Sequence, residues 1–413
     1  MNIIIFGKGG REHALAAKFA SDPRIEKVLV YPGNPGMLYT KKVSILNSIS
    51  EAELFNLLKT ERIEFGVVGP EDYMASGFAD KLRDLGLKLI SPTKEAAQLE
   101  SSKIFSKKIM NKYGIPTAKS FECYDLETGL VHLNKFSDGV VIKLSGLFAG
   151  KGVFVAETRE QAVTQLQTWQ EYLSSGYLLE EKLTGYEVSM FYLCKGKEFV
   201  YIGEASDHKR IYDGDLGPNT GGMGCYSPIP QLTSLDRMNI ESSIVNPTLK
   251  GLDAEKIFFS GILFVGIMMT KSGPYVLEYN VRFGDPETQT FLPLIKNGFL
   301  DLFLNFINDL DFKSTPITLD GHAVHVVKAA SGYPENPIIG DELTINSLLD
   351  QNYYFAGVTT DGLKLKTSGG RVCGLTSIGN NIQEARSNCY MNINQVSFRA
   401  EQFRKDIALK AIL

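Results

Sequence analysis

The chain has 413 residues, of which 44% are hydrophobic and 22% are charged, and its formal net charge is −4. This composition is typical of a globular protein with a sizeable core, and it argues against a protein that binds nucleic acid chiefly through phosphates. No apolar run approaches the roughly 20 residues of a membrane span. We therefore expect about two to four domains and neither a nucleic-acid nor a membrane partner.

The start of the chain and its cysteines bear on location. The opening run, MNIIIFGKGG, passes from an apolar strand straight into glycines, without the basic flank and cleavage-like site of a signal peptide. The cysteines lie far apart and form no CxxC pair, which argues against a zinc site or a disulfide framework. We expect a cytoplasmic monomer with reduced thiols, in a single-function form because no pattern of a further enzyme follows.

Residues 1–100 alternate strand and helix patterns. Strands are predicted at Asn2–Phe6, Val28–Tyr31, Gly66–Val68 and Leu87–Ile90, and helices at Glu12–Ala20, Glu51–Lys59 and Ala75–Leu85. Strands spaced by helices indicate βαβ units on a parallel sheet, so a Rossmann-like α/β domain is expected here.

The pattern changes after this first part. Residues 93–114 are predicted to be largely helical, and short strands follow at Gly139–Leu144, Gly152–Ala156, Tyr177–Glu181 and Glu187–Leu193, with a helix near Glu160–Leu173. A long glycine-rich loop is expected at 213–224, and helices near 234–252 and 286–309. From about Gly321 the sequence is strand-rich and closes with a helix at Ile382–Met391.

The first glycine turn lies in GKGGREHA, Gly7–Ala14. Between a strand and a helix, the backbone N–H groups of Gly9 and Gly10 can approach an anion, and Arg11 can add a charged donor. The spacing is not GxGxxG, because Glu12 stands where the third glycine would be, so a dinucleotide is not expected. The alternative is an ordinary tight turn.

Two further motifs are suited to a nucleotide. In Val140–Glu157, Lys143 ends a strand and Lys151 lies in a glycine loop that could close over phosphates, although the run is not a Walker A motif. In Leu178–Ser189, backbone groups around Glu180–Leu183 could read an adenine edge, and Glu187 could accept both ribose hydroxyls. An ordinary glycine hairpin and an exposed acidic hairpin are the alternatives.

The run VLEYNVRFGDPETQ, Val276–Gln289, carries polar residues on a strand. Glu278 and Asn280 alternate, so both point to one face, where their oxygens suit Mg²⁺ bound to ATP phosphates. Arg282, on the same face, could neutralise a developing phosphate or bind a carboxylate. Asp285 and Glu287 follow in the FGDPE turn.

The most distinctive segment is the polar loop Ser206–Pro228. So long a polar loop inside a compact domain is uncommon unless it is functional. Its opening residues offer donors and acceptors for a small zwitterion and a sugar phosphate; these are Asp207, His208, Lys209 and Arg210. Its later residues can wrap the backbone round a ligand; these are Asn219, Thr220 and Gly221. A surface excursion is the alternative.

Taken in order, these motifs resemble the ATP-grasp superfamily and, within it, the phosphoribosylamine–glycine ligase family. The runs that carry the resemblance span the chain: GKGGREHALA, YPGNPG, VVGPEDYMASG, AGKGV, DHKRIYDGDLGPNTGGMGCYSP, EYNVRFGDPETQ and GGRV. The glycine loop and the ExN strand are shared by the superfamily, whereas the DHKR…GPNTGGMG loop is specific to this family. Departures from the family pattern are Lys8, Asp72–Met74 and Phe355–Val358, the last in place of a HAGT-like run.

The resemblance implies a domain order and a reaction. A Rossmann-like domain at 1–100 would precede an ATP-grasp domain at 101–320, with its small lobe at about 121–192, and a β-rich C-terminal domain at 321–413. Members join glycine to 5-phosphoribosylamine while ATP is cleaved to ADP and phosphate, through glycyl phosphate, in purine biosynthesis. Lys103 and Lys143 would contact ATP phosphates, with Lys107 a competitor for Lys103.

The remaining roles also follow from the resemblance. Glu180, Glu181, Lys182 and Leu183 would frame the adenine, Glu187 would bind the ribose, and Glu278 and Asn280 would bind Mg²⁺ or Mn²⁺. Our candidates for binding the ribose 5-phosphate are two turns: Gly9–Arg11, and the turn formed by Asn34, Pro35 and Gly36. Asp207 and Lys209 are candidates for the glycine end, and Arg282 for the transferring phosphoryl group or the glycine carboxylate. The rival hypotheses are a biotin carboxylase-like or formate-using ATP-grasp ligase, and a non-catalytic nucleotide-binding module.

Overall fold

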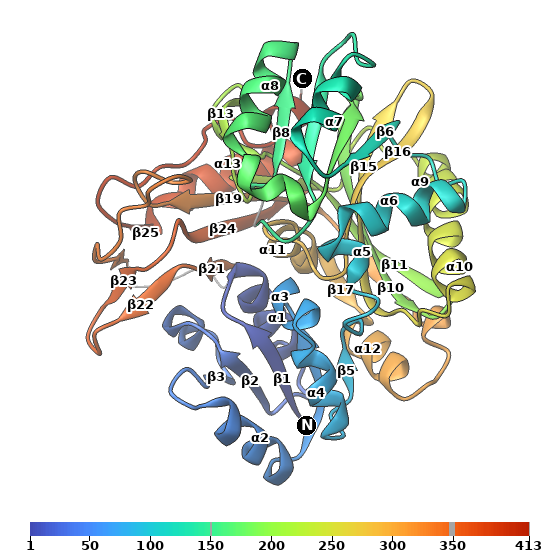
Figure 1. Cartoon of the computed structure of the whole chain (residues 1–413). Coiled ribbons are helices and arrows are strands. Elements are labelled where there is room, and N and C mark those ends of the chain that lie inside the picture. The colour runs from blue at the N-terminus through green and yellow to red at the C-terminus, as the bar shows by residue number, and fades with distance from the viewer. Residues whose placement is uncertain (149–150, 347–351, 413) are drawn as a thin grey trace.

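The computed structural model describes residues 1–148, 151–346 and 352–412. Within them the chain forms a five-stranded, a four-stranded and an eight-stranded sheet, together with smaller two-stranded ones. Figure 1 shows the N-terminal residues in blue at the bottom and the α7 and α8 region in green at the top. None of the helices in these described ranges has the length and apolar character needed to cross a lipid bilayer.

The N-terminal sheet is parallel, with strand order β3-β2-β1-β4-β5. Its strands are β1 (Asn2–Gly7), β2 (Lys27–Pro32), β3 (Val43–Ile45), β4 (Ile63–Val68) and β5 (Leu89–Ile90), and its helices are α1 (Gly10–Ala20), α2 (Glu51–Thr60), α3 (Glu71–Ala75) and α4 (Phe78–Asp84). The strands are apolar throughout because helices cover both faces of such a sheet. The predicted Rossmann-like fold class is confirmed, but the single helix predicted at Ala75–Leu85 is wrong, since Gly77 adopts φ +85° and separates α3 from α4.

The four-stranded sheet is antiparallel, in the order β6-β9-β7-β8. Its elements are β6 (Ser120–Cys123), α7 (Leu126–Leu133), β7 (Val140–Leu144), β8 (Val153–Ala156), α8 (Arg159–Thr168) and β9 (Tyr177–Glu181). A separate apolar core lies beneath it, which includes Ile142, Leu166 and Leu179. The helix predicted to reach Leu173 ends at Thr168 and continues as a 3₁₀ turn, Gln170–Ser175.

The largest sheet is antiparallel, in the order β16-β15-β10-β11-β14-β19-β24-β21. Its strands are β10 (Tyr186–Lys195), β11 (Glu198–Asp207), β14 (Gly224–Ser227), β15 (Ser260–Thr270), β16 (Gly273–Asn280), β19 (His322–Ala329), β21 (Tyr353–Phe355) and β24 (Arg371–Gly379). The pairing of β14 with β19 carries this sheet across residue 320 without a break.

Helices and short strands complete the chain. The helices are α5 (Gln98–Ser101), α6 (Lys103–Lys112), α9 (Ser234–Ile240), α10 (Asn246–Ala254), α11 (Glu287–Phe291), α12 (Phe299–Ile307) and α13 (Ile382–Asn392). The two-stranded pairs are β12 (Arg210–Tyr212) with β13 (Leu216–Asn219), β17 (Ile295–Asn297) with β18 (Thr318–Leu319), β20 (Thr344–Ile345) with β25 (Val396–Ser397), and β22 (Val358–Thr360) with β23 (Leu365–Thr367).

The segment 93–114 is largely helical, as predicted, and it forms two helices because Ser102 is extended and caps α6 through its side chain. Two other predictions of local structure need correction. The helix predicted at 286–309 is interrupted by β17, after which Gly298 adopts φ +82°. The glycine-rich loop predicted at 213–224 is not fully irregular, since β13 pairs with β12 to form a hairpin.

A tight contact joins the N-terminal domain to the C-terminal strands. Asn34 Nδ2 donates to the carbonyl oxygens of Lys8 (2.7 Å) and Phe355 (3.1 Å), and the Phe355 amide donates to His13 Nδ1 (2.8 Å). Gly36 lies so close to the Phe355 ring that a Cβ atom there would be 2.3 Å from Cγ. Phe355, a departure from the family pattern, therefore serves to dock the two parts of the chain.

We expect Gly36→Ala to lower the free energy of unfolding by about 1–3 kcal/mol, because the added methyl overpacks against Phe355. Urea denaturation of the variant and of the parent protein measures this cost. In a Phe355→Gly background both of the closest atoms, Cγ and the Cβ at 2.4 Å, are gone, so the same glycine substitution should cost much less. An equal cost in both backgrounds would contradict the packing explanation.

Candidate active site

A buried carboxylate is held between two lysines where the four-stranded sheet meets α6. Glu180 on β9 lies 2.8 Å from Lys143 Nζ on β7 and 2.9 Å from Lys107 Nζ on α6. Burial raises the pKa of Glu180, but the two lysines outweigh it and the net shift is downward. The carboxylate is therefore ionised, and it keeps both ammonium groups fixed.

The two lysines differ in the donors that they have left. Lys107 Nζ also donates to Thr117 Oγ1 (2.7 Å) and to the Ala118 carbonyl (3.1 Å), which uses all three of its N–H groups. Within the described ranges, Lys143 Nζ donates to Glu180 and to the Leu277 carbonyl (2.8 Å), which leaves one N–H without a described partner. Lys143, not Lys107, is thus equipped to contact a phosphate oxygen.

Lys103 lies at the edge of the glycine loop. Its Nζ donates to the Gly146 carbonyl at 3.2 Å, and burial lowers its pKa. Two of its donors have no partner among the described residues, so Lys103 is a better phosphate ligand than its competitor Lys107. Lys151 is exposed and its amide donates to the Phe148 carbonyl (2.9 Å), while Gly150 of the predicted loop lies outside the described residues.

A second ion pair joins strand β10, which carries Glu187, to the distinctive polar loop. Lys209 Nζ lies 2.6 Å from Glu187 Oε2. The charge of Lys209 lowers the pKa of Glu187. Burial lowers the pKa of Lys209, but the carboxylates of Glu187, Asp207 and Glu278 outweigh burial and raise this pKa well above its ordinary value. The carboxylate predicted to bind ribose is therefore already neutralised by a residue of the loop.

Glu278 and Asn280 form the oxygen face of β16. Within the described chain, no hydrogen bond or ion pair occupies the Glu278 carboxylate. Burial raises its pKa, but nearby positive charges outweigh burial and lower the pKa below its ordinary value; they belong to Lys209, Lys143, Lys103 and Arg282. Asn280 Oδ1 accepts one hydrogen bond, from Arg282 Nη2 at 3.0 Å, and keeps a second lone pair.

These two oxygens fit a hard divalent cation. No group of three or more His, Cys, Asp or Glu side chains able to hold a metal occurs among the described residues. Mg²⁺ takes only one or two protein carboxylates or amides and completes its shell with water and substrate phosphates. One free carboxylate and one amide, facing several lysines, therefore fit a cation that arrives with ATP.

Arg282 is more fully engaged than its predicted catalytic role requires. Its guanidinium lies 3.2 Å from Glu71 Oε2 and 3.0 Å from Glu100 Oε1, besides the bond to Asn280. Glu100 in turn accepts from the Val281 amide at 2.7 Å. In this arrangement Arg282 fixes the end of β16 and so orients Asn280, and the sequence offered no direct signal for its two acidic partners.

The N-terminal glycine turn meets the FGDPE turn. Arg11 Nη1 donates to the Phe283 carbonyl (3.0 Å) and its amide to Asp285 Oδ2 (3.4 Å), while its Nε pairs with Glu12 (2.6 Å). Glu12 fills the turn, since its Oε2 accepts from the Gly9 amide at 2.6 Å. The residue that stands in place of a third glycine thus binds the Gly9 amide, one of the N–H groups that were expected to approach an anion.

Asp285 also contacts the C-terminal strands. Arg371 Nη1 lies 3.2 Å from Asp285 Oδ1, donates to the Asp285 carbonyl (2.8 Å), and also donates to the carbonyl of Gly221. Tyr333 Oη accepts from the Gly221 amide at 2.9 Å. Segments that are far apart in sequence therefore meet around Asp285 and Gly221, and Arg371 and Tyr333 are contact residues to which sequence reasoning gave no role.

Several predicted residues have their side chains occupied elsewhere. Asn34 and Gly36 are committed to Phe355 as described above, and next to them Pro35 begins a 3₁₀ turn. His208 is buried with its Nδ1 unpartnered, and burial lowers its pKa to about 3. Thr220 Oγ1 donates to the Lys209 carbonyl (2.8 Å), next to Asn219, which pairs with Arg210.

The predicted adenine segment is a strand end. The Glu181 amide donates to the Lys119 carbonyl (3.0 Å), and its carboxylate accepts from the Lys119 amide (2.9 Å). Lys182 pairs with Glu157, and Leu183 is half-buried just beyond the strand. Backbone groups after Glu181 are the ones left to face a base.

Two carboxyls of the site influence each other. Burial, and then the charge of Asp207, raise the pKa of Glu287 to about 7, and burial also raises the pKa of Asp207. Ser189 Oγ donates to Glu287 Oε1 at 3.4 Å. Glu287 therefore retains its proton to a much higher pH than in the unfolded chain.

This shift predicts a stability change with pH. Between an unfolded pKa of 4.5 and a folded pKa of about 7, the folded protein binds more protons, so its stability falls as pH rises through that window. The full shift corresponds to about 3 kcal/mol. In metal-free buffer, Glu287→Gln should therefore gain stability relative to the parent between pH 5 and pH 8, as urea denaturation would measure. A difference between the two proteins that does not vary with pH would contradict the shift.

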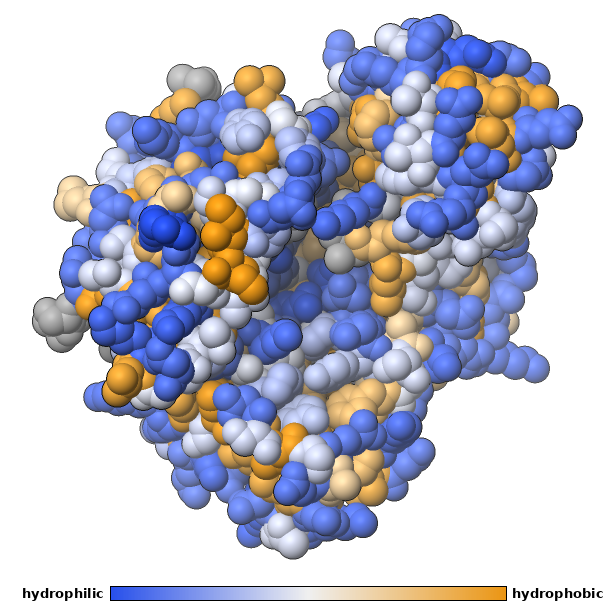
Figure 2. Space-filling model, turned by 60° about the vertical axis from the view of Figure 1, so that its left-hand side comes forward, coloured by the Kyte–Doolittle hydropathy of each residue, from blue (hydrophilic) through white to orange (hydrophobic). Residues whose placement is uncertain are grey.

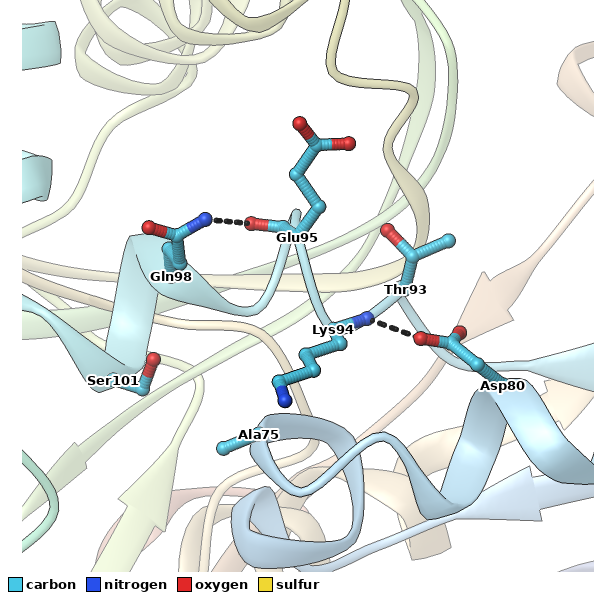
Figure 3. Close-up of a pocket in the computed structure, with 7 residues that line it drawn as sticks. All are labelled: Ala75, Asp80, Thr93, Lys94, Glu95, Gln98 and Ser101. Carbon is cyan, nitrogen blue, oxygen red and sulfur yellow. Dashed lines mark hydrogen bonds between the residues drawn. The ribbon is translucent and has the colours of Figure 1, made fainter.

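The surface of the molecule is hollowed in two places. In the space-filling view, a mostly hydrophilic hollow separates the upper-right lobe from the rest of the molecule (Figure 2). A separate open hollow of about 560 Å³ is lined by Ala75, Asp80, Thr93, Lys94, Glu95, Gln98 and Ser101 (Figure 3). Its polar groups bond among themselves, as the Lys94 amide does to Asp80 (2.9 Å), and none of the predicted site residues lines it.

The architecture is that of ATP-grasp proteins. Biotin carboxylase from Campylobacter jejuni superposes with a TM-score of 0.71 over 99% of this chain and 94% of its own, at 13% identity, a likeness of fold alone. Residues 101–288 also match an ATP-grasp (A) domain, so the chain is an ATP-grasp protein, and the two lysines and the Glu278–Asn280 strand lie within that domain.

Within that class the family is clear. Residues 1–100, 101–288 and 323–410 match the N domain, the ATP-grasp (A) domain and the C domain of phosphoribosylglycinamide synthetase. The chain belongs to this family, as its resemblance predicted.

Relatives agree over the full length. A phosphoribosylamine–glycine ligase of Fusobacterium nucleatum is 38% identical over 98% of both chains. A human trifunctional purine biosynthetic protein is 40% identical over 99% of this chain, which spans 42% of the human protein. The crystal structure of phosphoribosylamine–glycine ligase from Thermotoga maritima has a TM-score of 0.87 at 34% identity, covering 99% of this chain and 100% of the other.

Proposed function

We propose that this chain joins glycine to 5-phosphoribosylamine in purine biosynthesis, with ATP cleaved to ADP and phosphate. Family membership over the full length and the lysine–carboxylate site together support this reaction. The single observation that carries it is the ion pair, at 2.6 Å, between Glu187, the carboxylate assigned to ribose, and Lys209 of the polar loop. We also propose the domain division 1–100, 101–320 and 321–413, with a small lobe at about 121–192, and a monomer.

ATP would bind between the four-stranded and eight-stranded sheets. We assign Lys103 and Lys143 to its phosphates because both retain unused N–H donors. The backbone after Glu181 would frame the adenine, and Glu187 the ribose, once Lys209 turns toward the substrates. Glu278 and Asn280 would hold the cation, which would offset charge on the phosphates when bound.

Glycine must first be activated, because an amine does not displace oxide from a carboxylate. Its carboxylate would attack the γ-phosphorus of ATP; the bond from γ-phosphorus to the bridging oxygen breaks, and ADP leaves with glycyl phosphate formed. Lys143 would stabilise the charge on the transferring group. The amine of phosphoribosylamine would then attack the acyl carbon, losing a proton as phosphate departs.

The substrate ends follow from the remaining contacts. Asp207 and Lys209 would hold glycine, whose ammonium and carboxylate match their charges. The turn Gly9–Arg11, the FGDPE turn at Asp285 and the loop at Gly221 would surround the phosphoribosylamine. Arg282, with four acceptors already bound, is better assigned to orienting Asn280 than to binding the phosphoryl group.

ADP release with defined acceptors tests the proposal. The protein is incubated with ATP, Mg²⁺ and glycine, phosphoribosylamine, bicarbonate or formate, singly and in pairs. Turnover that requires both glycine and phosphoribosylamine is expected. Turnover with bicarbonate or formate would favour the other ATP-grasp ligases, and binding of ATP without any turnover would favour a non-catalytic module.

A further inference from the structure

The C-terminal tail after α13 reaches back to the hairpin formed by β12 and β13. Arg404 is 1% exposed, and its Nη1 lies 2.7 Å from Asp215 Oδ1 and donates to the Arg210 carbonyl at 3.1 Å. Its Nε and Nη2 each donate to the Asp406 carboxylate at 2.7 Å. All three guanidinium nitrogens are engaged with the protein, so this arginine holds the hairpin rather than a substrate.

Two backbone amides strengthen the same contact. The Lys405 amide donates to Asp213 Oδ1 and the Gly214 amide donates to Asp406 Oδ2, each at 2.8 Å. Beyond the hairpin, at the start of β14, Ile407 packs so closely that a Cβ on Gly224 would lie 2.7 Å from its Cδ1. The tail therefore contacts both the tip and the base of the segment that carries the distinctive polar loop.

The hairpin sets the position of Lys209. Arg210, whose carbonyl Arg404 binds, directly follows Lys209 in the chain. At the hairpin base, the Thr220 amide and hydroxyl both donate to the Lys209 carbonyl, at 2.7 and 2.8 Å. Lys209 Nζ then reaches Glu187, so the backbone on both sides of this lysine is fixed by contacts that include the tail.

We infer that Arg404 is a positioning residue for the acceptor side of the site. Through Asp215 and Asp406 it locks the hairpin, so that the backbone that carries Asp207 and Lys209 is in place before substrates arrive, while the Lys209 side chain can still turn from Glu187 toward them. Ordering these groups in advance removes a cost that substrate binding would otherwise bear. The kinetic consequence rests on the proposed function, whereas the locking itself does not.

Two variants and a control test this inference in the full-length protein. Asp215→Asn removes the charge partner of Arg404. The Asp215 side chain is 55% exposed and its backbone has φ +55°, a conformation that asparagine tolerates, so the fold should be retained. Arg404→Lys keeps the charge but cannot bridge both partners. The control is Arg399→Gln, which removes a 77% exposed arginine of the same tail, paired with Asp341.

Hydrogen–deuterium exchange and steady-state kinetics give separate readouts. Both variants should speed exchange in residues 210–220 while β10 and β15 stay protected, and the double variant should add little to the stronger single change. We expect the KM for glycine or phosphoribosylamine to rise about tenfold, as for a lost charge-assisted hydrogen bond, with the KM for ATP within about twofold. Arg399→Gln should match the parent in every measurement.

Other results would overturn the inference. Unchanged exchange in residues 210–220, or an equal rise in all three KM values, would mean that Arg404 only stabilises the fold. If the parent protein does not consume glycine and phosphoribosylamine, the proposed function fails. The exchange data then decide alone: faster exchange in both variants supports locking by Arg404, and unchanged exchange refutes it.

Discussion

Replacing Glu278 by Gln should lower kcat for ADP formation by about 10²–10³-fold, since a metal contributes several kcal/mol to stabilising charge in the transition state. The substitution keeps the shape of the side chain and removes the one carboxylate of the β16 face that no other described residue binds. The Mg²⁺ concentration for half-maximal activity should rise in parallel, because an amide oxygen is a weaker ligand. Steady-state ADP release over a Mg²⁺ titration measures both.

The control for this variant is Glu198→Gln, on the same large sheet but paired with Lys313 at the surface. It should leave kcat and the Mg²⁺ dependence as in the parent. Thermal unfolding of both variants without metal separates lost folding from lost catalysis. A Glu278→Gln enzyme with kcat within twofold of the parent and an unchanged Mg²⁺ requirement would place the cation on other residues.

Asp207→Asn is the second large effect that we expect. If Asp207 holds the glycine ammonium, the KM for glycine should rise about 10–100-fold, because a hydrogen bond between charged groups is worth roughly 1.5–3 kcal/mol. The KM for ATP should change little. Initial rates at saturating ATP and phosphoribosylamine, with glycine varied, measure the effect.

The same variant carries a second readout. The charge of Asp207 helps to raise the pKa of Glu287, so its removal should lower the pH at which Glu287 ionises. The pH at which stability falls in metal-free buffer should shift downward accordingly. Asp253→Asn, at a surface pair with Lys197, is the control. Glycine kinetics identical to those of the parent would remove Asp207 from the glycine site.

Local sequence patterns predicted the backbone well where one period dominated. The strand β1 and helix α1 lie within a residue or two of their predicted ends, and so does β7. Predictions were wrong where a single glycine interrupted a helical pattern, at Gly77 and Gly298. At these positions one residue's backbone conformation outweighed the pattern of its neighbours.

By itself, the sequence determined the fold class, the order of the motifs and the family, because glycine turns, strand periodicity and the ExN run are local features. The tertiary structure decided which of two nearby lysines keeps a free donor, and that Arg282 is bound by Glu71 and Glu100. It also decided that Arg371 and Arg404 support the polar loop from the C-terminal part. The physical reason is that a side chain's remaining hydrogen-bonding capacity depends on partners hundreds of residues away, which no local pattern records.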